Sequence, residues 1–236
     1  MQLLRNIPEV LPQPCVATIG FFDGVHRGHR YLIEQVREVA AAHGFASGVV
    51  TFPVHPRKVV QPEYHPELLT TCEEKVSLLA ETGLDYCMML DFTPDVAILS
   101  AKEFMLFLYN HYNIRALVIG YDHRFGHNRS EGFDDYVRYG QELGIEVILA
   151  HAYIDKDVAV SSSVIRQLLS EGNVSEAASC LGYDYFLNGI VVSGYRVGRK
   201  IGFPTANLRV DDPDKLVPSD GVYAVRVTVC LLYTSD

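Results

Sequence analysis

The 236-residue sequence has few cysteines, and their arrangement matches no structural pattern. The number of cysteines is odd, they lie far apart, and no two are spaced Cys-x-x-Cys: they are Cys15, Cys72, Cys87, Cys180 and Cys230. This spacing excludes a disulfide framework and a cysteine zinc site, and it predicts a reducing, cytoplasmic location.

Long hydrophobic runs are also missing. No stretch approaches the roughly 18 uncharged apolar residues that a membrane span needs. The first residues, MQLLRNIPEVLPQP, contain no uninterrupted apolar region of the kind that a secretory signal has. We therefore expect a globular protein with no membrane partner, and the apolar content of 48% is ordinary for that class.

Positive charge is scarce, since 20 Lys and Arg residues face 29 Asp and Glu residues and the net charge is −9. This balance argues against a nucleic-acid partner, which needs a basic surface. A small anionic substrate remains compatible with it, because several basic groups are gathered in two loops: Arg27 and Arg30 in the first, Arg124 and Arg129 in the second.

Apolar runs and helical patterns alternate from residue 15 to residue 150. The runs predict strands at 15–20, 46–52, 85–92, 114–120 and 145–150. The patterns between them predict helices at 29–44, 72–83, 101–112 and 132–144, with a proline-rich loop over 53–66. This order predicts an α/β fold whose parallel sheet is covered by helices on both faces and binds ligands at the carboxyl ends of its strands. Phe104, Phe107 and Leu108 are expected in the core, and Asp134-Asp135 on a solvated helix face.

The pattern changes after His151. Residues 161–182 predict two short helices, the first entered through a serine cap. From Phe186 onward the sequence has β-type runs and glycines, and no helix is expected there. The simplest division is therefore a first domain over 1–183 and a second over 184–236.

Residues 20–30 read GFFDGVHRGHR and lie where the first strand meets the first helix. The string is neither a Walker A loop nor a dinucleotide fingerprint. A zinc site would need a third ligand that the sequence does not mark. Two interpretations remain, a glycine-rich turn with surface histidines or a phosphate site. The second has physical support, because a helix start attracts anions, glycines allow close approach, and histidines donate hydrogen bonds, with added charge as imidazolium.

His26-Arg27-Gly28-His29 resembles the H-x-G-H signature of a nucleotidyltransferase superfamily, and the longer string resembles the prokaryotic bifunctional riboflavin kinase/FAD synthetases. Four further strings resemble that family: TFPVHP (51–56), LLTTCEEKVSLLAETGLD (68–85), VIGYDHRFGHNRSEG (118–132) and VSSSVIRQLLSEGNVSEAASCLG (160–182). The order Pro53-Val54 departs from the family's usual loop, and Ser163 stands where threonine is usual. The resemblance implies a Rossmann-like H-x-G-H nucleotidyltransferase domain.

The resemblance also implies roles for individual residues. His26, His29 and Arg166 would be catalytic and would hold the ATP phosphates. Nucleotide contacts are implied for Gly20, Phe21, Phe22, Asp23, Gly24, Gly28, Gly120, Asp122 and Ser162. Flavin contacts are implied for His55, Arg124 and Phe125. Simpler readings stay open: an ion pair between Asp122 and Arg124, a plain helix cap at Ser161–Ser163, a solvated His55, and His123 and His127 facing water.

Residues 189–208, GIVVSGYRVGRKIGFPTANL, resemble the entry to the family's riboflavin kinase domain, a small six-stranded β-barrel. The resemblance implies a loop around ATP at Gly194, Gly198 and Gly202, with nucleotide phosphate and Mg²⁺ bound by the Pro204, Thr205, Ala206 and Asn207 element. Thr205 and Asn207 would be the magnesium ligands. The final TVCLLYTSD departs from the family's pattern, and the later barrel elements with the general-base glutamate are missing. We therefore expect an incomplete barrel that lacks kinase activity and is loosely folded or prone to aggregate.

The function implied by the resemblance is transfer of AMP from ATP to FMN, with Mg²⁺, to give FAD and pyrophosphate. Transferases acting on pantetheine phosphate or nicotinamide mononucleotide share the histidine signature but lack the flavin-specific strings. A class I aminoacyl-tRNA synthetase needs a longer chain and a tRNA surface, which the net charge of −9 disfavours. A non-catalytic fragment that binds flavin or nucleotide is the alternative from another class.

Overall fold

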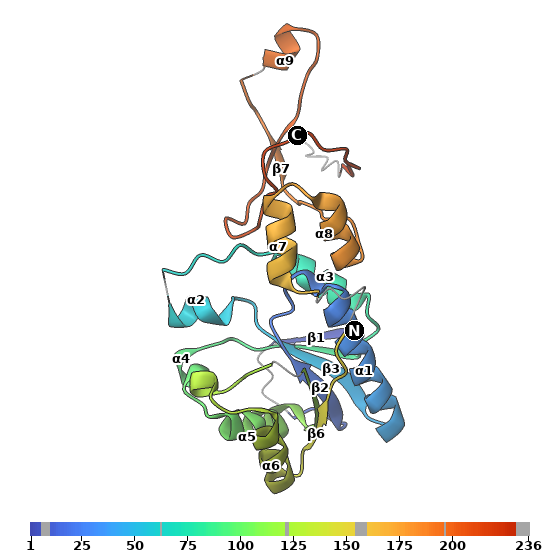
Figure 1. Ribbon diagram of the computed structural model, residues 1–236, viewed down its shortest axis with the longest axis vertical. Helices are drawn as coiled ribbons and strands as arrows, with labels where there is room; N and C mark the ends of the chain where they lie inside the picture. The colour runs from blue at the N-terminus through green and yellow to red at the C-terminus, as the bar shows by residue number, and fades with distance from the viewer. Residues whose placement is uncertain (6–9, 62, 121–122, 154–159, 196, 230–236) are drawn as a thin grey trace, which may run out of the picture.

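A computed structural model describes residues 1–5, 10–61, 63–120, 123–153, 160–195 and 197–229 (Figure 1). Its centre is a six-stranded sheet in which every neighbouring pair is parallel. The strands are β1 (Gln2–Arg5), β2 (Cys15–Ile19), β3 (Ala46–Thr51), β4 (Tyr86–Met89), β5 (Ile114–Ile119) and β6 (Glu146–Leu149). Five of the six strands were predicted from the sequence. The edge strand β1 was not, because it has four residues and only Leu4 is buried.

The strand order β1-β4-β3-β2-β5-β6 places the turning point of the topology at β2. The chain runs outward from β2 through β3 and β4 on one side, and it continues through β5 and β6 on the other. Ligands in open sheets of this kind bind in the crevice at such a turning point, outside the carboxyl ends of the strands. That crevice is bordered here by the residues that follow β2 and β5.

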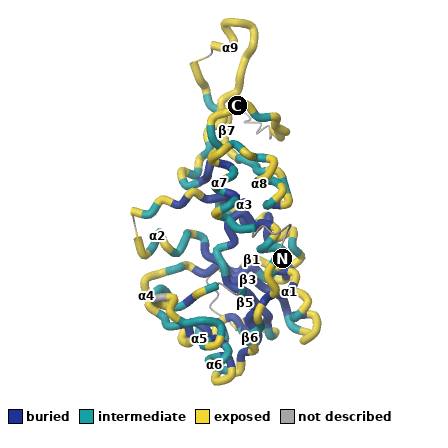
Figure 2. Tube along the Cα trace, viewed as in Figure 1, coloured by how far each residue is buried: buried dark blue, intermediate teal, exposed yellow. Residues whose placement is uncertain are grey.

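Alternate residues of each strand serve the two faces of the sheet. On one face, Ala17 and Ile19 of β2 share an apolar cluster with α5 (Ala101–Tyr112) and α6 (Phe133–Leu143). On the other face, Val16 belongs to a cluster with α1 (Arg27–His43) and α3 (Cys72–Ala80). The expected parallel sheet with helices on both faces is confirmed. Figure 2 shows the buried residues concentrated along these strands.

The expected core stripe of α5 is also confirmed. Phe104 and Leu108 are buried, and Phe107 is packed at the edge of the same cluster. The solvated face expected for the acidic pair of α6 is confirmed for Asp134, which is exposed. Asp135 is half-buried, and its carboxylate accepts a hydrogen bond from the Gly132 N–H at the helix start.

Short helices account for the differences from the sequence expectation. The proline-rich loop contains α2 (Pro56–Val60), which begins with proline at its first position. A second short helix, α4 (Pro94–Ala97), begins the same way, and η1 (Asp23–Val25) and η2 (His127–Arg129) are single 3-10 turns. The prediction of no helix after Phe186 was wrong, since α9 (Val197–Lys200) lies there. Each of these short helices has three to five residues, which is too short for a recognisable apolar period.

The predicted helix pair after residue 160 is confirmed as α7 (Ser162–Ser170) and α8 (Val174–Leu181). The two helices form a small apolar cluster together with Leu69 and Leu216. Beyond them the chain forms an antiparallel pair, β7 (Ile190–Val192) with β8 (Asn207–Arg209), at the far end of the molecule in Figure 1. Among the described residues after 183 this pair is the only sheet, so a barrel is not confirmed. In the same ranges, no helix has the length and apolarity needed to cross a membrane.

Candidate active site

The turn that follows β2 is the most unusual stretch of backbone in the structure. Phe22 and Val25 have φ values of 55° and 36°, and Gly24 has 79°. Positive φ at a non-glycine residue costs on the order of 1–3 kcal/mol and concentrates at functional sites. At Gly20 a Cβ atom would lie 3.1 Å from the Phe22 ring, so the glycine lets this ring fold back over the strand end.

His26 and His29 lie together at the start of α1. His26 is the N-cap, and its Nδ1 accepts a hydrogen bond of 3.3 Å from the His29 N–H. The two imidazole rings stack with centroids 3.6 Å apart and an interplanar angle of 17°. Gly28 makes room for the His26 ring, which would lie 3.2 Å from a Cβ at that position. His26 is 5% exposed, which contradicts the interpretation of a turn with surface histidines.

Both histidines are neutral at pH 7. Burial lowers the pKa of His26 from 6.5 to about 4, and the nearby Arg166 charge lowers it further. Burial also holds the pKa of His29 well below its usual value, with added repulsion from His26 and Lys75. In the ligand-free site these rings can therefore serve as hydrogen-bonding groups but add no imidazolium charge. Because Nδ1 of His26 is an acceptor, the proton of its neutral ring is assigned to Nε2, which is then a hydrogen-bond donor.

His29 contributes a second sign of a binding site. Its Nδ1 is buried and has no hydrogen-bond partner among the described residues. A buried polar atom left unpaired costs about 1–3 kcal/mol, and each case in a native structure calls for an explanation.

Asp23 and Arg166 form the ionic centre of the site. The Asp23 carboxylate accepts hydrogen bonds from the N–H groups of Leu69 and Thr70, and Arg166 Nη2 donates to it at 2.7 Å. Arg166 Nε donates to the Glu67 carbonyl at 2.6 Å. Asp23 is thus a buried anchor, and it holds a cation of α7 beside the two histidines.

Further hydrogen bonds fix this turn from other elements. The Ser162 hydroxyl donates to the Asp23 carbonyl at 3.0 Å, and Ser161 caps α7, which confirms the cap reading for this serine run. Thr70 Oγ1 accepts from the Gly24 N–H, and the Tyr183 hydroxyl donates to the Gly24 carbonyl. The turn is therefore held by α7 and by the chain before α3 and after α8.

A group of rings lies beside the turn with a buried lysine. Lys75 Nζ lies 3.9 Å from the Phe21 ring centroid and donates to the Phe52 carbonyl at 2.7 Å. Burial lowers the pKa of Lys75 to about 8. The half-buried His55 ring packs edge-on against Phe21 with centroids 4.7 Å apart, so this histidine is not simply solvated.

A cleft of about 830 Å³ opens on the side of Arg166. Its walls come from two separate stretches of chain, the loop 64–67 with Lys58, and the segment 213–217. Arg166 therefore lies between the ionic centre at Asp23 and an open space large enough for a small molecule.

The described residues 123–132 of the loop after β5 do not join the histidine cluster. Arg124 is exposed and donates to the Glu131 carbonyl, whereas Phe125 is 7% exposed and its ring stacks on Tyr136. Gly120 directly follows β5, and the predicted Asp122 lies outside the described residues. His127 is exposed as expected, but His123 is half-buried. The flavin role of Arg124 and Phe125 stays a prediction.

The residues of the expected kinase site lie far from this centre. Gly202, Pro204, Thr205 and Asn207 are all exposed, on the outlying arm that carries β7, α9 and β8 (Figures 1 and 2). Gly194 and Gly198 are in contact with Asn207 and Phe203 of the same arm. In the described part of the chain, no three His, Cys, Asp or Glu side chains cluster as a metal-binding group.

Sequence reasoning missed four residues that hold the site together. Thr70 and Lys75 lie in a string that already resembled the family, so their position was a usable signal. Tyr183 and Lys215 carry no such signal, because each meets the turn or its neighbours from a distant stretch.

Comparison with known proteins agrees with the sequence resemblance. The FAD synthetase family matches residues 9–164, and the riboflavin kinase family matches residues 181–232. A bifunctional riboflavin kinase/FMN adenylyltransferase of Escherichia coli K12 is 36% identical over 231 residues, covering 96% of this chain and 73% of the relative. The namesake from Listeria monocytogenes is 35% identical and covers 91% of this chain and 68% of the relative.

A solved structure has the same fold. It is described as a macrolide-efflux protein from Streptococcus pneumoniae, and it has 33% sequence identity and a TM-score of 0.79. The match covers 90% of this chain and 69% of that structure. Taken with the two family matches and the relatives, it shows that this chain belongs to the bifunctional riboflavin kinase/FMN adenylyltransferase family.

Proposed function

We propose that this chain transfers the AMP group of ATP to FMN, giving FAD and pyrophosphate. An oxygen of the FMN phosphate attacks the α-phosphorus of ATP, and a new P–O bond forms there. The bond from the α-phosphorus to the bridging oxygen breaks, and its electron pair leaves with pyrophosphate. Chemistry of this type needs positioning and charge stabilisation from the protein more than covalent help.

The observation that carries the proposal is the stacked pair of neutral histidines with Arg166 held nearby by Asp23. His26 Nε2–H would donate to a phosphate oxygen as the negative charge moves toward the leaving group. Arg166 supplies fixed positive charge, since a guanidinium stays protonated at all working pH values. Ser162 and Asp23 orient this arginine and the turn, and Gly28 keeps the histidine rings close.

A bound triphosphate would change the protonation of the histidines. Negative charge within about 4–6 Å favours the protonated form of an imidazole and so raises its pKa. Neutral rings in the free site thus become stronger partners when the anion arrives. Phe21 and His55, with Lys75 behind them, offer an aromatic wall that suits a flavin or adenine ring.

Magnesium belongs to the proposal through the kind of donor present. Mg²⁺ binds few protein oxygens and several waters, together with substrate phosphates. The hydroxyl of Thr205 and the amide oxygen of Asn207 are exposed oxygen donors of this kind, so they would hold an ion on the outlying arm. An ion for AMP transfer would instead bind the ATP phosphates beside the histidine pair. When bound, Mg²⁺ would neutralise phosphate charge.

For the same 236 residues we propose that riboflavin kinase activity is lacking. After residue 183, the described ranges carry one two-stranded pair and many exposed apolar side chains, among them Val222, Val225, Val227 and Val229. A barrel excludes water only when its sheet closes. Formation of FMN from riboflavin and ATP by the purified chain would overturn this part of the proposal.

The test of the transferase is direct. The full chain is incubated with FMN, ATP and Mg²⁺, and FAD and pyrophosphate are measured by chromatography and a coupled assay. We expect both products in equal amounts, and a loss of at least 100-fold in kcat for His26→Asn, which keeps a helix cap but removes the Nε2–H donor, a typical scale for one transition-state hydrogen-bond donor. A folded chain that binds ATP without making FAD would favour the non-catalytic binding alternative.

A further inference from the structure

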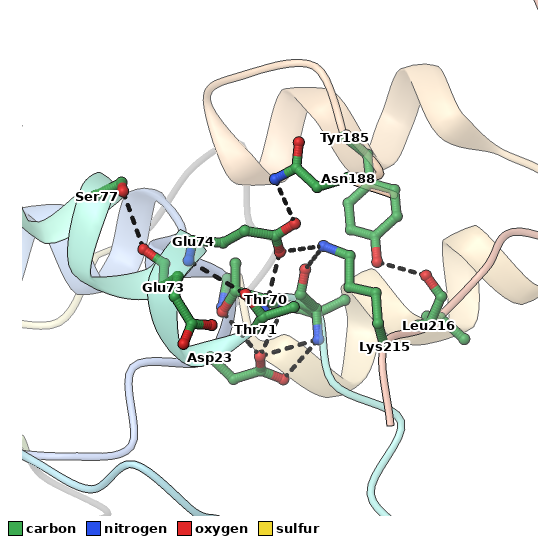
Figure 3. A network of polar contacts seen from close by, with 12 residues as sticks. Asp23, Thr70, Thr71, Glu73, Glu74, Ser77, Tyr185, Asn188, Lys215 and Leu216 are labelled. Atoms are coloured by element: carbon green, nitrogen blue, oxygen red, sulfur yellow. Dashed lines mark hydrogen bonds and ion pairs between the residues drawn. The ribbon is translucent and has the colours of Figure 1, made fainter. Parts of the chain in front are cut away.

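Lys215 is a lysine of the kinase-matching segment that is buried against the transferase part of the chain. Its side chain is 1% exposed, and its ammonium forms an ion pair of 2.6 Å with Glu74, whose side chain is 4% exposed. It also donates a hydrogen bond of 2.7 Å to the Leu69 carbonyl. Figure 3 shows the Lys215 ammonium next to the Glu74 carboxylate, with the Tyr185 ring alongside.

Backbone contacts seat the whole segment around this lysine. The Leu68 N–H donates to the Asp214 carbonyl, and the Leu216 N–H donates to the Leu68 carbonyl at 2.8 Å. Leu216 is 8% exposed and belongs to the apolar cluster of α7 and α8. The segment thus pairs with the loop 68–71 in the manner of a short parallel strand.

The same loop is the one that holds the ionic centre. Leu69 offers its carbonyl to Lys215 and its N–H to Asp23, so a single residue joins the two. Asp23 in turn binds Arg166. Glu74 of α3 also holds this loop, because its carboxylate accepts hydrogen bonds from the Thr71 N–H, the Asn188 amide and the Lys215 ammonium (Figure 3).

We propose that Lys215 is a positioning residue for the transferase site, which fixes the loop 69–71 so that Asp23 presents Arg166 beside the histidine pair. The proposal rests on the function proposed above. It makes the kinase-matching segment a working part of the transferase site, with the Lys215 ammonium buried between Glu74 and the Leu69 carbonyl.

Energetics favour a positioning role over simple stabilisation. A buried ion pair is often no more stabilising than well-packed apolar side chains of the same volume, so stability alone does not account for it. The Lys215 ammonium does, however, fix the position of the Glu74 carboxylate relative to the Leu69 carbonyl, because it donates a hydrogen bond to each. The three other ion pairs in the described part of this segment, Lys58–Asp214, Arg209–Asp211 and Arg226–Asp184, share no atom with the Asp23 network.

The closing experiment compares four forms of the full chain. Lys215→Met removes the ammonium but leaves Glu74 buried without a cation, so this variant loses stability as well. Lys215→Met with Glu74→Gln removes both charges, and the glutamine oxygen still accepts the Thr71 N–H. Arg226→Gln is the matched control, because Arg226 is an exposed cation of the same segment.

Steady-state FAD synthesis and thermal unfolding are measured for each form. We expect the double variant to unfold below the wild type, because the Leu69 carbonyl loses its donor, but above Lys215→Met, while its KM for ATP rises at least tenfold and its kcat falls less. Arg226→Gln should match the wild type in all three quantities. A double variant that is folded and has the wild-type KM for ATP would overturn the proposal.

A second readout separates this proposal from the function on which it rests. Coupling between sites is reciprocal, so ATP bound beside Arg166 must also tighten the docked segment. Hydrogen exchange at the Leu216 amide of the wild-type chain is measured with and without ATP and Mg²⁺. We expect exchange at least threefold slower with ATP, even if no FAD is formed. Equal exchange rates would refute the coupling, whereas absence of FAD alone would refute only the proposed reaction.

Discussion

His26 makes the stability of this protein depend on pH in a way that one substitution isolates. Its pKa is about 4 in the folded chain because the ring is buried and lies near Arg166, against 6.5 as the ordinary value. Between these two values the unfolded chain binds a proton that the folded chain does not. The free energy of unfolding therefore falls as pH drops from 6.5 toward 4, and the contribution is fully present above pH 6.5.

The magnitude follows from the same two values. Each unit of pKa difference corresponds to about 1.4 kcal/mol, so the interval between 6.5 and about 4 gives about 3 kcal/mol for His26 alone. This is a large share of the roughly 5–15 kcal/mol that stabilises an ordinary domain.

His26→Asn removes the titrating ring and keeps an N-cap, because an asparagine oxygen accepts the His29 N–H in the same role. The free energy of unfolding is measured in urea at pH 7 and pH 4 for both proteins. At pH 7 the variant is less stable, since it loses the ring stacking. We expect the stability difference between the two proteins to shift by about 3 kcal/mol in favour of the variant at pH 4.

Ile33→Val is the control for lost packing. Ile33 is a buried residue of the same helix, and this substitution changes no ionisable group, so its stability difference should be equal at both pH values. A His26→Asn difference that also stays constant would refute the assignment of a neutral, desolvated histidine at this position.

Three further changes test other parts of the site. Asp23→Asn removes the charge facing Arg166, so we expect the free energy of unfolding to fall by about 2–4 kcal/mol and FAD synthesis to slow. Urea unfolding measures the first and chromatography the second. Unchanged stability and rate would contradict the anchor role of Asp23. Gly126→Ala places a Cβ atom 2.5 Å from the Ala101 nitrogen at a φ of +87°, so the midpoint temperature of thermal unfolding should fall. A midpoint equal to that of the wild type would contradict the close approach of residue 126 to the start of α5. Burial lowers the pKa of Lys75 to about 8, so between pH 8 and pH 10 the unfolded chain holds a proton that the folded chain has lost. Over this range the free energy of unfolding of the wild type should rise by about 2 kcal/mol relative to that of Lys75→Met. A constant difference between the two proteins in urea unfolding would contradict a buried charge at Lys75.

Periodicity in the sequence was sufficient to predict most of the fold. The strands from β2 to β6 and the long helices have enough residues for an alternating or helical pattern, and each helix boundary lies near a capping residue such as Ser100 or Gly44. Edge strand β1 and the short helices α2, α4 and α9 were not predicted, because four or five residues with little burial repeat the period too few times for it to be recognised.

The candidate site was predicted in its residues but not in its electrostatics. The motif marked His26 and His29, yet whether an imidazole is charged depends on what surrounds it. Burial and Arg166, whose partner Asp23 lies 143 positions away in the sequence, make His26 neutral. No local pattern encodes a neighbour at that separation, so the sequence alone left the charge of these histidines open.

Contacts of the histidine turn cross the domain boundary that the sequence predicts after residue 183. Composition changes there, and the two family matches also change near that point. The buried Glu74, however, has its cation in Lys215, and the Gly24 carbonyl has its donor in Tyr183. A carboxylate buried without a cation is costly, because desolvation is no longer offset by a partner charge. The physical unit that holds the histidine turn in place therefore extends through residue 216, beyond the boundary that the sequence pattern favours.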